Sequence, residues 1–310
     1  MDLTVVLAGL IVGFVVGLTG MGGGALMTPV LVLFFGITPL AAVSSDLVAA
    51  AVMKPVGSWV HMRQGTIHWG LVRWLMVGSV PSAFAGVLVL RSLGDSADVQ
   101  AVVRTSLGIA LLVAASAMVY KAYLTLVARA HKEAAQARGE VVEAPPQGPI
   151  VVRPLPTVLI GAAGGLIVGM TSVGSGSLII IALLALYPAL TANRLVGTDL
   201  VQAVPLVASA ALGHVLFGDF QFDLTASLLL GSVPGVYAGA HLSARAPGWL
   251  IRRALAIVLL VSGLKLLNVP TVQLGIVLVL TVALGPLLWA SVRRRESQRA
   301  VSWPESVMSG

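Results

Sequence analysis

The chain has 310 residues, of which 57% are hydrophobic and only 10% are charged, and its mean hydropathy is +0.98. A soluble domain averages about 25% charged residues, so this composition excludes a water-soluble fold and indicates an integral membrane protein. The net charge of +7 does not indicate nucleic-acid binding, because the cations lie in short loops between apolar runs, where they are typical topology signals. There is no cysteine, which excludes disulfides and thiol chemistry.

Eleven apolar runs follow one another along the chain, and they are continuous rather than alternating. This pattern favours membrane-spanning helices over a β-barrel. In the first half the runs lie at about 3–19, 25–37, 45–60, 69–90 and 102–127. In the second half they lie at about 157–172, 177–190, 196–216, 223–243 and 250–268, with a further run at about 271–291. We therefore predict an all-α polytopic membrane protein with two repeats of about five helical segments and one extra C-terminal transmembrane helix.

A polar stretch separates the two halves. Between Arg129 and Pro156, charged residues and alanines precede a cluster of proline and glycine, which predicts a linker that is helical at first and then extended. The predicted division is a first transmembrane repeat at 1–128, a cytoplasmic linker at 129–156, a second repeat at 157–268, the extra helix at 269–292 and a cytoplasmic tail at 293–310. We expect the last part of the tail, Ser297–Gly310, to be disordered.

Each half contains a glycine-rich break in apolar sequence, GFVVGLTGMGGGALMTP at Gly13–Pro29 and GLIVGMTSVGSGSLIII at Gly165–Ile181. At an offset of 152, the equivalent positions are Gly17 with Gly169, Thr19 with Thr171, Gly22 with Gly174 and Gly24 with Gly176. Glycine is unfavourable inside a plain helix, so two equivalent clusters predict broken helices at a binding site between two repeats. For Gly13-x3-Gly17 and Gly165-x3-Gly169, we favour the simpler interpretation of close helix packing through small residues.

The repeat extends well beyond the glycines. At an offset of 153, Ser45–Val48 matches Thr198–Val201, and the pair His61 and Gly65 matches His214 and Gly218. The block Gly78–Pro81 matches Gly231–Pro234, and Gly86 matches Gly239. A repeat of this length indicates an internal duplication of the transmembrane segments.

Loop charges predict the orientation of the two halves. The linker and the C-terminal tail are both rich in basic residues and are therefore expected in the cytoplasm; these are Arg129, Lys132, Arg138 and Arg153 in the linker and Arg293, Arg294, Arg295 and Arg299 in the tail. The loop with Arg63 falls on the same side, whereas its equivalent at Phe217–Phe222 has Asp219 and neither lysine nor arginine, as expected of an outside loop. An odd number of segments per half leads to the same conclusion, which is that the repeats are inverted. We expect the N-terminus to lie outside.

The segment after the first glycine cluster is short. Its run of about 13 residues would extend about 20 Å, against a hydrocarbon core about 30 Å thick. We therefore favour a re-entrant or half-spanning hairpin around each glycine cluster, with the glycines partway into the membrane.

The two breaks are the predicted substrate site. Glycine lets the backbone approach a ligand closely, and the half-helices that follow would direct free N–H groups and positive dipole ends at it, which suits an anion. No Walker lysine follows at the right spacing, so nucleotide binding is not predicted. The candidate substrate-binding residues are Thr19, Gly20, Gly22, Gly23 and Gly24 in the first break, Thr171, Ser172, Gly174, Ser175 and Gly176 in the second, and Lys54.

Charged residues inside apolar runs are the other candidates. Asp46 and Asp199 stand near the starts of equivalent segments, so they could cap helices or couple transport to protons or another cation. Lys54 follows Asp46 by eight residues, which places both on much the same helix face. It could snorkel to the membrane interface or serve as the counter-charge for an anion.

Two equivalent histidines are candidates for gating. His61 and His214 end equivalent segments, four residues before Gly65 and Gly218. An interfacial or structural histidine is the simpler interpretation, and a pH-responsive gate is the alternative.

Enzyme signatures are missing, because the sequence has no HExxH, no GxSxG and no acidic metal cluster. We therefore predict that the chain is not an enzyme and needs no cofactor or metal. The expected partners are a small anion, the lipid bilayer and a coupling ion, H⁺ or Na⁺. A homodimer is a further expectation, and nucleic acid is not expected.

The combination of motifs resembles the sulfite exporter TauE/SafE family of bacterial inner-membrane transporters. The resemblance is carried by Gly20–Gly24 with Pro29, by the Ser45–Leu47 and Thr198–Leu200 steps, by the two His-x3-Gly pairs, and by the Gly78–Gly86 and Gly231–Gly239 blocks. It extends from about residue 5 to residue 268. The resemblance implies a secondary transporter of small anionic compounds such as sulfite, other sulfur oxyanions or organosulfonates.

We therefore predict an alternating-access carrier for a small anion, driven by a proton or ion gradient. The alternatives are a passive channel for a small anion or neutral solute and a membrane scaffold that transports nothing.

Overall fold

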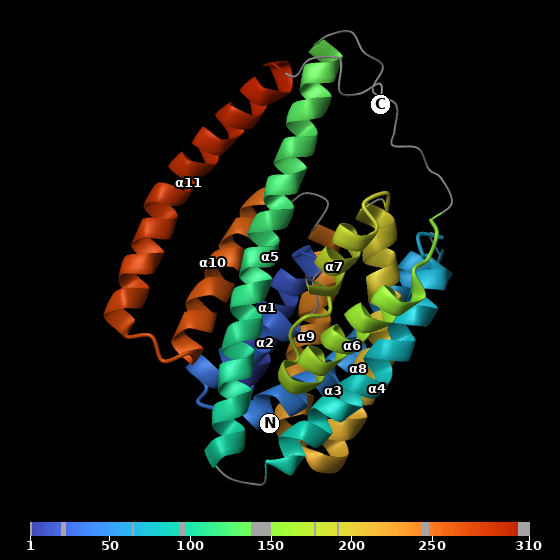
Figure 1. Cartoon of the computed structure of the whole chain (residues 1–310). Coiled ribbons are helices and arrows are strands. Elements are labelled where there is room, and N and C mark those ends of the chain that lie inside the picture. The colour runs from blue at the N-terminus through green and yellow to red at the C-terminus, as the bar shows by residue number, and fades with distance from the viewer. Residues whose placement is uncertain are drawn as a thin grey trace.

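The computed structural model describes residues 2–19, 23–63, 65–93, 97–137, 150–176, 178–190, 192–242 and 248–302, and in these ranges every regular element is a helix (Figure 1). In chain order the helices are α1 (Leu3–Thr19), α2 (Gly24–Phe34), α3 (Pro39–Arg63), α4 (Trp69–Ser92), α5 (Ala97–Ala137), α6 (Pro154–Thr171), α7 (Leu178–Leu186), α8 (Ala192–Phe217), α9 (Phe222–Leu242), α10 (Gly248–Leu266) and α11 (Thr271–Ser302). Each apolar run of the sequence coincides with one of them. The predicted all-α architecture is confirmed.

Helix length separates the elements that can cross a bilayer alone from those that cannot. By length and apolar composition, α4, α5, α6, α8 and α11 are candidate membrane spans. Helices α2 and α7 have only 11 and 9 residues, so they extend about 16 Å and about 13 Å. Each is too short to cross a hydrocarbon core about 30 Å thick.

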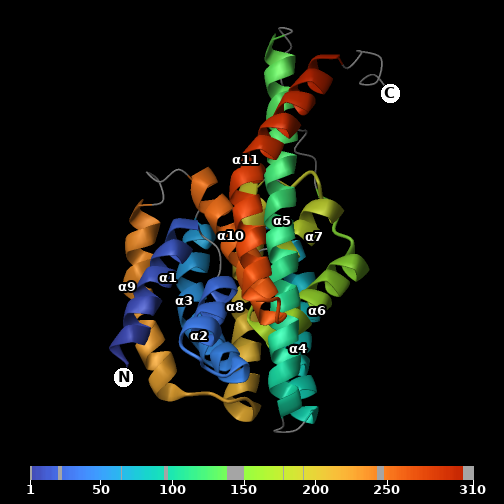
Figure 2. The same ribbon diagram turned by 90° about the vertical axis from the view of Figure 1, so that its left-hand side faces the viewer.

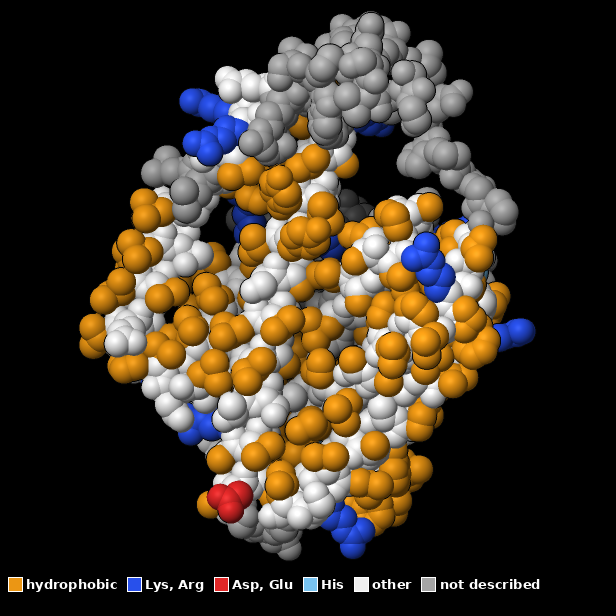
Figure 3. Space-filling model, viewed as in Figure 1, with side chains coloured by type: hydrophobic (Ala, Val, Ile, Leu, Met, Phe, Trp, Pro, Cys, Tyr) orange, Lys and Arg blue, Asp and Glu red, His pale blue; other side chains and the backbone are white. Residues whose placement is uncertain are grey.

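The surface fits a protein surrounded by lipid. Hydrophobic side chains cover most of the face in Figure 3, and the few charged side chains lie mainly towards its edges. Large apolar side chains such as Leu3, Ile11, Phe222 and Val272 are exposed, at 65% or more of their surface. An exposed apolar surface of this extent is normal against lipid and unusual in water. The chain is thus a multi-pass membrane protein.

The two halves of the chain exchange helices. Helix α1 of the first half packs along α9 of the second, and α6 of the second half packs along α4 of the first (Figure 2). Helix α3 packs on its equivalent α8, and α5 packs on its equivalent α10. Each half therefore completes the other, and neither forms a separate bundle.

Glycines set the distance between the exchanged helices. A Cβ on Gly13 of α1 would lie 2.6 Å from the carbonyl oxygen of Ser232 in α9, and a Cβ on Gly165 of α6 would collide with the carbonyl oxygen of Ser79 in α4. These two contacts are equivalent at the offsets of the sequence repeat, 152 and 153. The helix packing predicted for Gly13 and Gly165 is confirmed, and the same set of backbone contacts is made twice.

The apolar core consists of two clusters. One includes Leu75 of α4 and Leu183 of α7, and the other includes Leu111 of α5 and Leu228 of α9. Helix α3 contributes Leu47 to the first cluster and Ala42 to the second. It therefore runs between the two clusters, and Asp46 on α3 lies deep in the molecule.

Two expectations from the sequence are wrong. Helices α3 and α8 begin at Pro39 and Ala192, seven residues before Asp46 and Asp199. These carboxylates therefore lie in helix interiors and are not N-caps. The start of the C-terminal tail is also ordered, because α11 continues to Ser302 as one helix of 32 residues. Residues 303–310 lie outside the described ranges.

Candidate functional site

The glycine-rich breaks of the two halves touch each other. Gly24 is the first residue of α2, and Ser172 follows the last residue of α6. A Cβ on Gly24 would collide with the carbonyl oxygen of Ser172 and lie 2.6 Å from its hydroxyl oxygen. Only glycine allows this approach, because any side chain at Gly24 would push the two breaks apart. The contact joins positions that are 148 residues apart in the sequence.

The second break is a tight turn with a left-handed backbone. Ser172, Gly174 and Gly176 have φ angles of 60°, 130° and 97°, a region that non-glycine residues rarely adopt. The carbonyl of Gly174 accepts a hydrogen bond from the N–H of Leu178, the first residue of α7. Thr171 uses its hydroxyl within the turn, because it donates to the carbonyl of Ile167 at 2.6 Å. Thr171 therefore shapes the break and does not present its hydroxyl to a ligand here.

Asp46 connects three elements at this contact. Its Oδ2 accepts hydrogen bonds from the hydroxyls of Thr28 in α2 and Ser172 after α6, both at 2.8 Å. Its Oδ1 has no hydrogen-bond partner among the residues that the structure describes, although the side chain is 0% exposed. A buried carboxylate oxygen without a partner is unfavourable, so this oxygen marks a place where an ion or proton is expected.

Lys54 lies about two turns after Asp46 in α3 and reaches the second break. Its ammonium group donates to the hydroxyl of Ser175 in the second break. It is also close enough to interact electrostatically with both Asp46 and Asp199. The lysine therefore points into the junction between the halves and does not snorkel to the membrane interface.

Asp199 is held differently from its equivalent Asp46. The amide Nε2 of Gln202 donates to Asp199 Oδ1 at 3.1 Å, and the hydroxyl of Ser79 donates to Gln202 Oε1 at 3.2 Å. The backbone N–H of Gly176 also faces this carboxylate. Asp199 is 1% exposed. Its charge is thus supported by donors on two sides, whereas one oxygen of Asp46 is left without any.

Sequence reasoning missed two of these residues, Thr28 and Gln202. Both are polar side chains in apolar helices, which is a signal of function in a membrane protein. Gln202 also follows Asp199 by three residues, so the two side chains are neighbours on one helix face. Neither has a counterpart in the other half, where Ile180 and Ala49 occupy the equivalent positions.

His214 lies in a neighbouring buried contact. Its Nδ1 is 2.8 Å from the hydroxyl of Ser44 in α3, and its Nε2 is 2.7 Å from the carbonyl of Gly169 in α6. The carbonyl can only accept, so Nε2 carries a proton. His214 thus links α8 to α3 and α6 one turn away from the charged site. The side chains of His61 and Thr19, and all of Gly20 and Gly22, lie outside the described residues.

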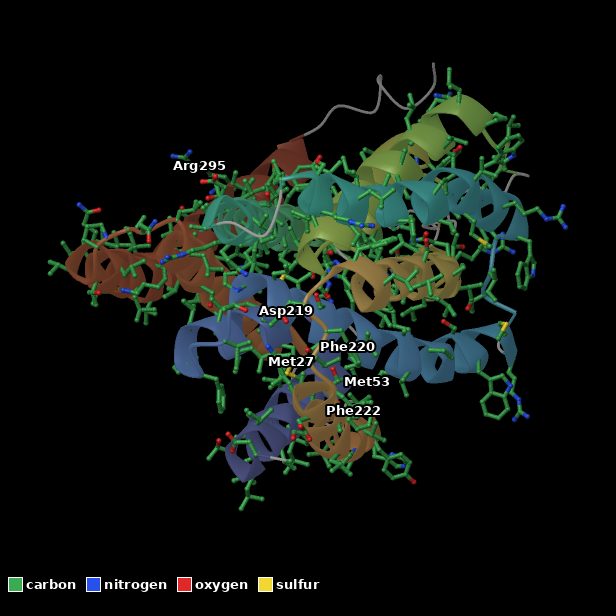
Figure 4. All side chains as sticks on the ribbon, turned by 90° about the horizontal axis from the view of Figure 1, so that it is seen from below. Met27, Met53, Asp219, Phe220, Phe222 and Arg295 are labelled. Atoms are coloured by element: carbon green, nitrogen blue, oxygen red, sulfur yellow. The ribbon has the colours of Figure 1, made fainter. Side chains whose placement is uncertain are left out.

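Gly23 lies against the unpartnered side of Asp46. A Cβ on Gly23 would be 4.0 Å from Asp46 Oδ1 and 3.7 Å from the terminal methyl of Met53. Figure 4 shows Met27 of α2 and Met53 of α3 near the middle of the molecule, while Arg295 of α11 points away from it. The flexible thioether of Met53 can change its rotamer without a large energetic penalty, so it can make room beside Asp46.

The site thus combines opposite charges with hydroxyl and backbone donors. Asp46, Asp199 and Ser172 are buried, whereas Lys54, Ser175 and Gly176 are half-buried, so the site is more accessible at the lysine than at the carboxylates. The described residues include no cluster of three or more histidines or carboxylates that could hold a metal ion. The arrangement can bind a small ion at the junction of two broken helices.

These features define a class of protein, a multi-pass α-helical membrane protein with a charged site where two broken helices meet. Residues 5–266 match the family model described as Sulfite exporter TauE/SafE. The chain belongs to this family and is therefore a membrane transporter and not an enzyme, and the resemblance stated from the sequence is confirmed.

Curated relatives agree with the family. The chain is 38% identical to the probable membrane transporter protein YjnA of Bacillus subtilis over 268 residues, which are 86% of this chain and 100% of that protein. It is 23% identical to the probable membrane transporter protein YdhB of the same organism over 263 residues, which are 85% of this chain and 99% of that protein. No solved structure matches the chain.

Proposed function

We propose that the chain carries a small anion by alternating access and that the anion binds at Lys54, where the two glycine-rich breaks meet. The contact of Lys54 with Ser175 supports this most directly. A lysine inside a membrane protein is retained where it pairs with a charge, and the N-terminus of α7 adds a positive dipole end. Family membership favours a sulfur oxyanion or an organosulfonate, such as sulfite, as the anion.

The alternating-access mechanism follows from the repeat. We propose that the two halves are inverted in the membrane and rock around the site, as in other transporters built from inverted repeats. The reciprocal packing of α1 on α9 and of α6 on α4 supports this, because a pseudo-two-fold axis generates that exchange. The short helices α2 and α7 are then the inner arms of half-spanning or re-entrant hairpins.

The charges of the site support coupling to a second ion. Two carboxylates and one ammonium give the empty site a net charge of −1 when all three are ionised. Adding an anion would make a buried site still more negative, which is unfavourable at low dielectric. A proton or Na⁺ would offset this charge. Family membership favours a bacterial inner-membrane location, and the loop arginines favour an N-terminus outside and a C-terminus in the cytoplasm.

A thermal-shift screen of the purified protein tests the binding site. Sulfite, thiosulfate, sulfonates, sulfate and small carboxylates are compared, because a ligand that binds the folded state raises the unfolding temperature, and the rise grows with the ratio of its concentration to its Kd. We expect a shift with at least one sulfur oxyanion, lost in Lys54→Met and kept in the matched control Lys265→Met, whose lysine binds Thr271 after α10. A shift that survives Lys54→Met would contradict the assignment of the site.

Flux through proteoliposomes separates the proposed carrier from a passive channel. A carrier saturates and supports counterflow, in which unlabelled anion on one side drives labelled anion across. A channel does neither. If the protein shows no thermal shift with any tested anion and no flux, it is neither a carrier nor a channel for these anions, and a scaffold role is favoured.

A further inference from the structure

The two carboxylates of the site have unequal partners, although they occupy equivalent positions in the two halves. Asp199 receives the amide of Gln202 and faces the N–H of Gly176. Asp46 receives two hydroxyls on Oδ2 and nothing from the described residues on Oδ1. A carboxylic acid protonated on Oδ1 keeps Oδ2 as a hydrogen-bond acceptor. Protonation of Asp46 on Oδ1 would therefore keep both of its hydrogen bonds, whereas the donors around Asp199 favour its ionised form.

A metal cation fits the empty side of Asp46 less well than a proton does. Hard metal cations are held by several oxygen ligands. Among the described residues, the buried oxygens without a partner on α3 are Asp46 Oδ1 and the hydroxyl of Ser45. A proton needs only the one oxygen.

Lys54 makes the proton and the anion depend on each other. The lysine lies within electrostatic reach of both carboxylates and serves as their counter-charge in the empty site. An anion on the lysine takes over that counter-charge, so the two buried carboxylates lose the compensation that Lys54 gives them. Among the residues that the structure describes, the other titratable groups to consider are Lys121 of α5, which faces Asp199, and His214 of α8, which is engaged by Ser44 and Gly169. Helix α2 and the second break contribute hydroxyls.

We propose that Asp46 takes up a proton on Oδ1 each time a monovalent anion binds at Lys54, and that Asp199 takes up the second proton when the anion is divalent. This inference rests on the proposed anion site and specifies its coupling. The net charge of the site then stays the same with and without substrate, so the number of protons equals the charge of the anion. Anion and protons occupy the same site at the same time and cross the membrane in the same direction.

Isothermal titration calorimetry of the full chain in detergent tests the proposal. Binding is measured in buffers of different ionisation enthalpy, which reports the protons taken up per anion bound. Methanesulfonate is the monovalent probe and thiosulfate is the divalent probe, and each titration is made without Na⁺ and repeated with Na⁺. We expect uptake of about one proton with methanesulfonate and about two with thiosulfate near neutral pH.

Substitutions assign the protons to residues. In Asp46→Asn, a neutral mimic of the protonated acid, methanesulfonate should bind with no proton uptake and with an affinity that no longer falls between about pH 5.5 and about pH 8. Asp199→Asn should keep the uptake of one proton with methanesulfonate and lose the second with thiosulfate. Asp219→Asn makes the same change of charge in the α8–α9 loop, outside the site, and should behave as the parent chain.

The outcomes separate this inference from the proposed function. Anion binding without proton uptake, equal uptake for the two probes, or an absolute requirement for Na⁺ overturns the proton assignment and leaves the anion site standing. Binding of neither probe at any pH overturns both. If Asp46→Asn does not fold, the ratio of proton uptake between the two probes in the parent chain decides alone.

Discussion

At the scale of single residues, the site depends on hydroxyls that hold a buried carboxylate. Ser172 belongs to the second half and Asp46 to the first, so their hydrogen bond of 2.8 Å ties the two halves together. The hydroxyl of Thr28 donates to the same oxygen from within the first half. The geometry of Asp46 is thus set by both repeats.

Removing the hydroxyl of Ser172 should destabilise the protein. Ser172→Ala leaves Asp46 with one donor, and an unsatisfied buried charge-assisted hydrogen bond costs about 1–3 kcal/mol. We expect a lower thermal unfolding midpoint in detergent, and a coupling energy with Thr28→Ala in a double-mutant cycle. Ser116→Ala is the control, because the exposed hydroxyl of Ser116 only binds Leu112 in its own helix. Equal effects of Ser172→Ala and Ser116→Ala would show that the Asp46 contact is unimportant for stability.

Adjacent glycines in the first break should differ sharply. In Gly24→Ala the new Cβ meets the carbonyl oxygen of Ser172, so the two breaks must separate. Overpacking of this kind costs about 1–3 kcal/mol. Among the described residues, the Cβ in Gly23→Ala meets only Met53 and Asp46, at 3.7 Å and 4.0 Å, which are ordinary contacts.

Thermal unfolding and anion binding of both variants check this difference. Gly24→Ala should lower stability and weaken binding, whereas Gly23→Ala should stay near the parent chain. A destabilised Gly23→Ala with an intact Gly24→Ala would mean that the two breaks do not meet as described.

At the scale of elements, the apolar runs predicted each helix that the structure describes. The reason is that a chain in lipid must form its backbone hydrogen bonds within each membrane-spanning segment. Helix α3 begins at Pro39, before the apolar run at about 45–60, and Thr38-Pro39 is a sequence signal for that start. Proline is favoured at the first helical position, and the carbonyl of Thr38 accepts from the N–H of Ala42. The polar residues Ser44–Asp46 obscured this start, since they resemble a cap.

The partners inside the site could not be predicted from the sequence. Thr28 and Asp46 are 18 residues apart, and Ser172 and Asp46 are 126 residues apart. Such pairs depend on how the halves exchange helices, and local patterns carry no information on that exchange. The repeat located both breaks. It could not predict that the second break would supply Ser175 as the hydroxyl partner of Lys54, or that Gly24 of the first break would contact Ser172.

The exchanged helix pairs should be sensitive to side-chain volume. In Gly165→Ala the Cβ collides with the carbonyl of Ser79, which must separate α6 from α4. We expect a clear fall in the unfolding midpoint, whereas Gly275→Ala in α11 should leave it unchanged or slightly raised. A Cβ on Gly275 meets nothing within 4 Å, and alanine favours a helix over glycine by about 1 kcal/mol. Equal midpoints for the two variants would contradict the close packing of α6 on α4.

At the scale of the whole molecule, α11 lies apart from the residues of the candidate site. It contacts α5 and α10 on the outside of the bundle (Figure 1). Its most apolar stretch has no buried residue among those that the structure describes. The family match ends at residue 266, and YjnA is covered over its whole length by 268 residues of this chain. The helix is thus an addition to the part shared with the family.

Deleting residues 269–310 should therefore leave transport intact. Every residue placed in the site precedes α10, and α10 itself remains packed on α5. We expect the truncated chain to bind the anion within about twofold of the full chain, because distant sites behave independently. The measurement is the anion-dependent thermal shift together with flux in proteoliposomes. A second truncation after residue 247 also removes α10, exposes the buried Leu107 and Leu111 of α5, and should abolish folding. If the shorter deletion folds but no longer binds the anion, α11 supports the site through α5 and α10, and the site is not confined to the shared part of the chain.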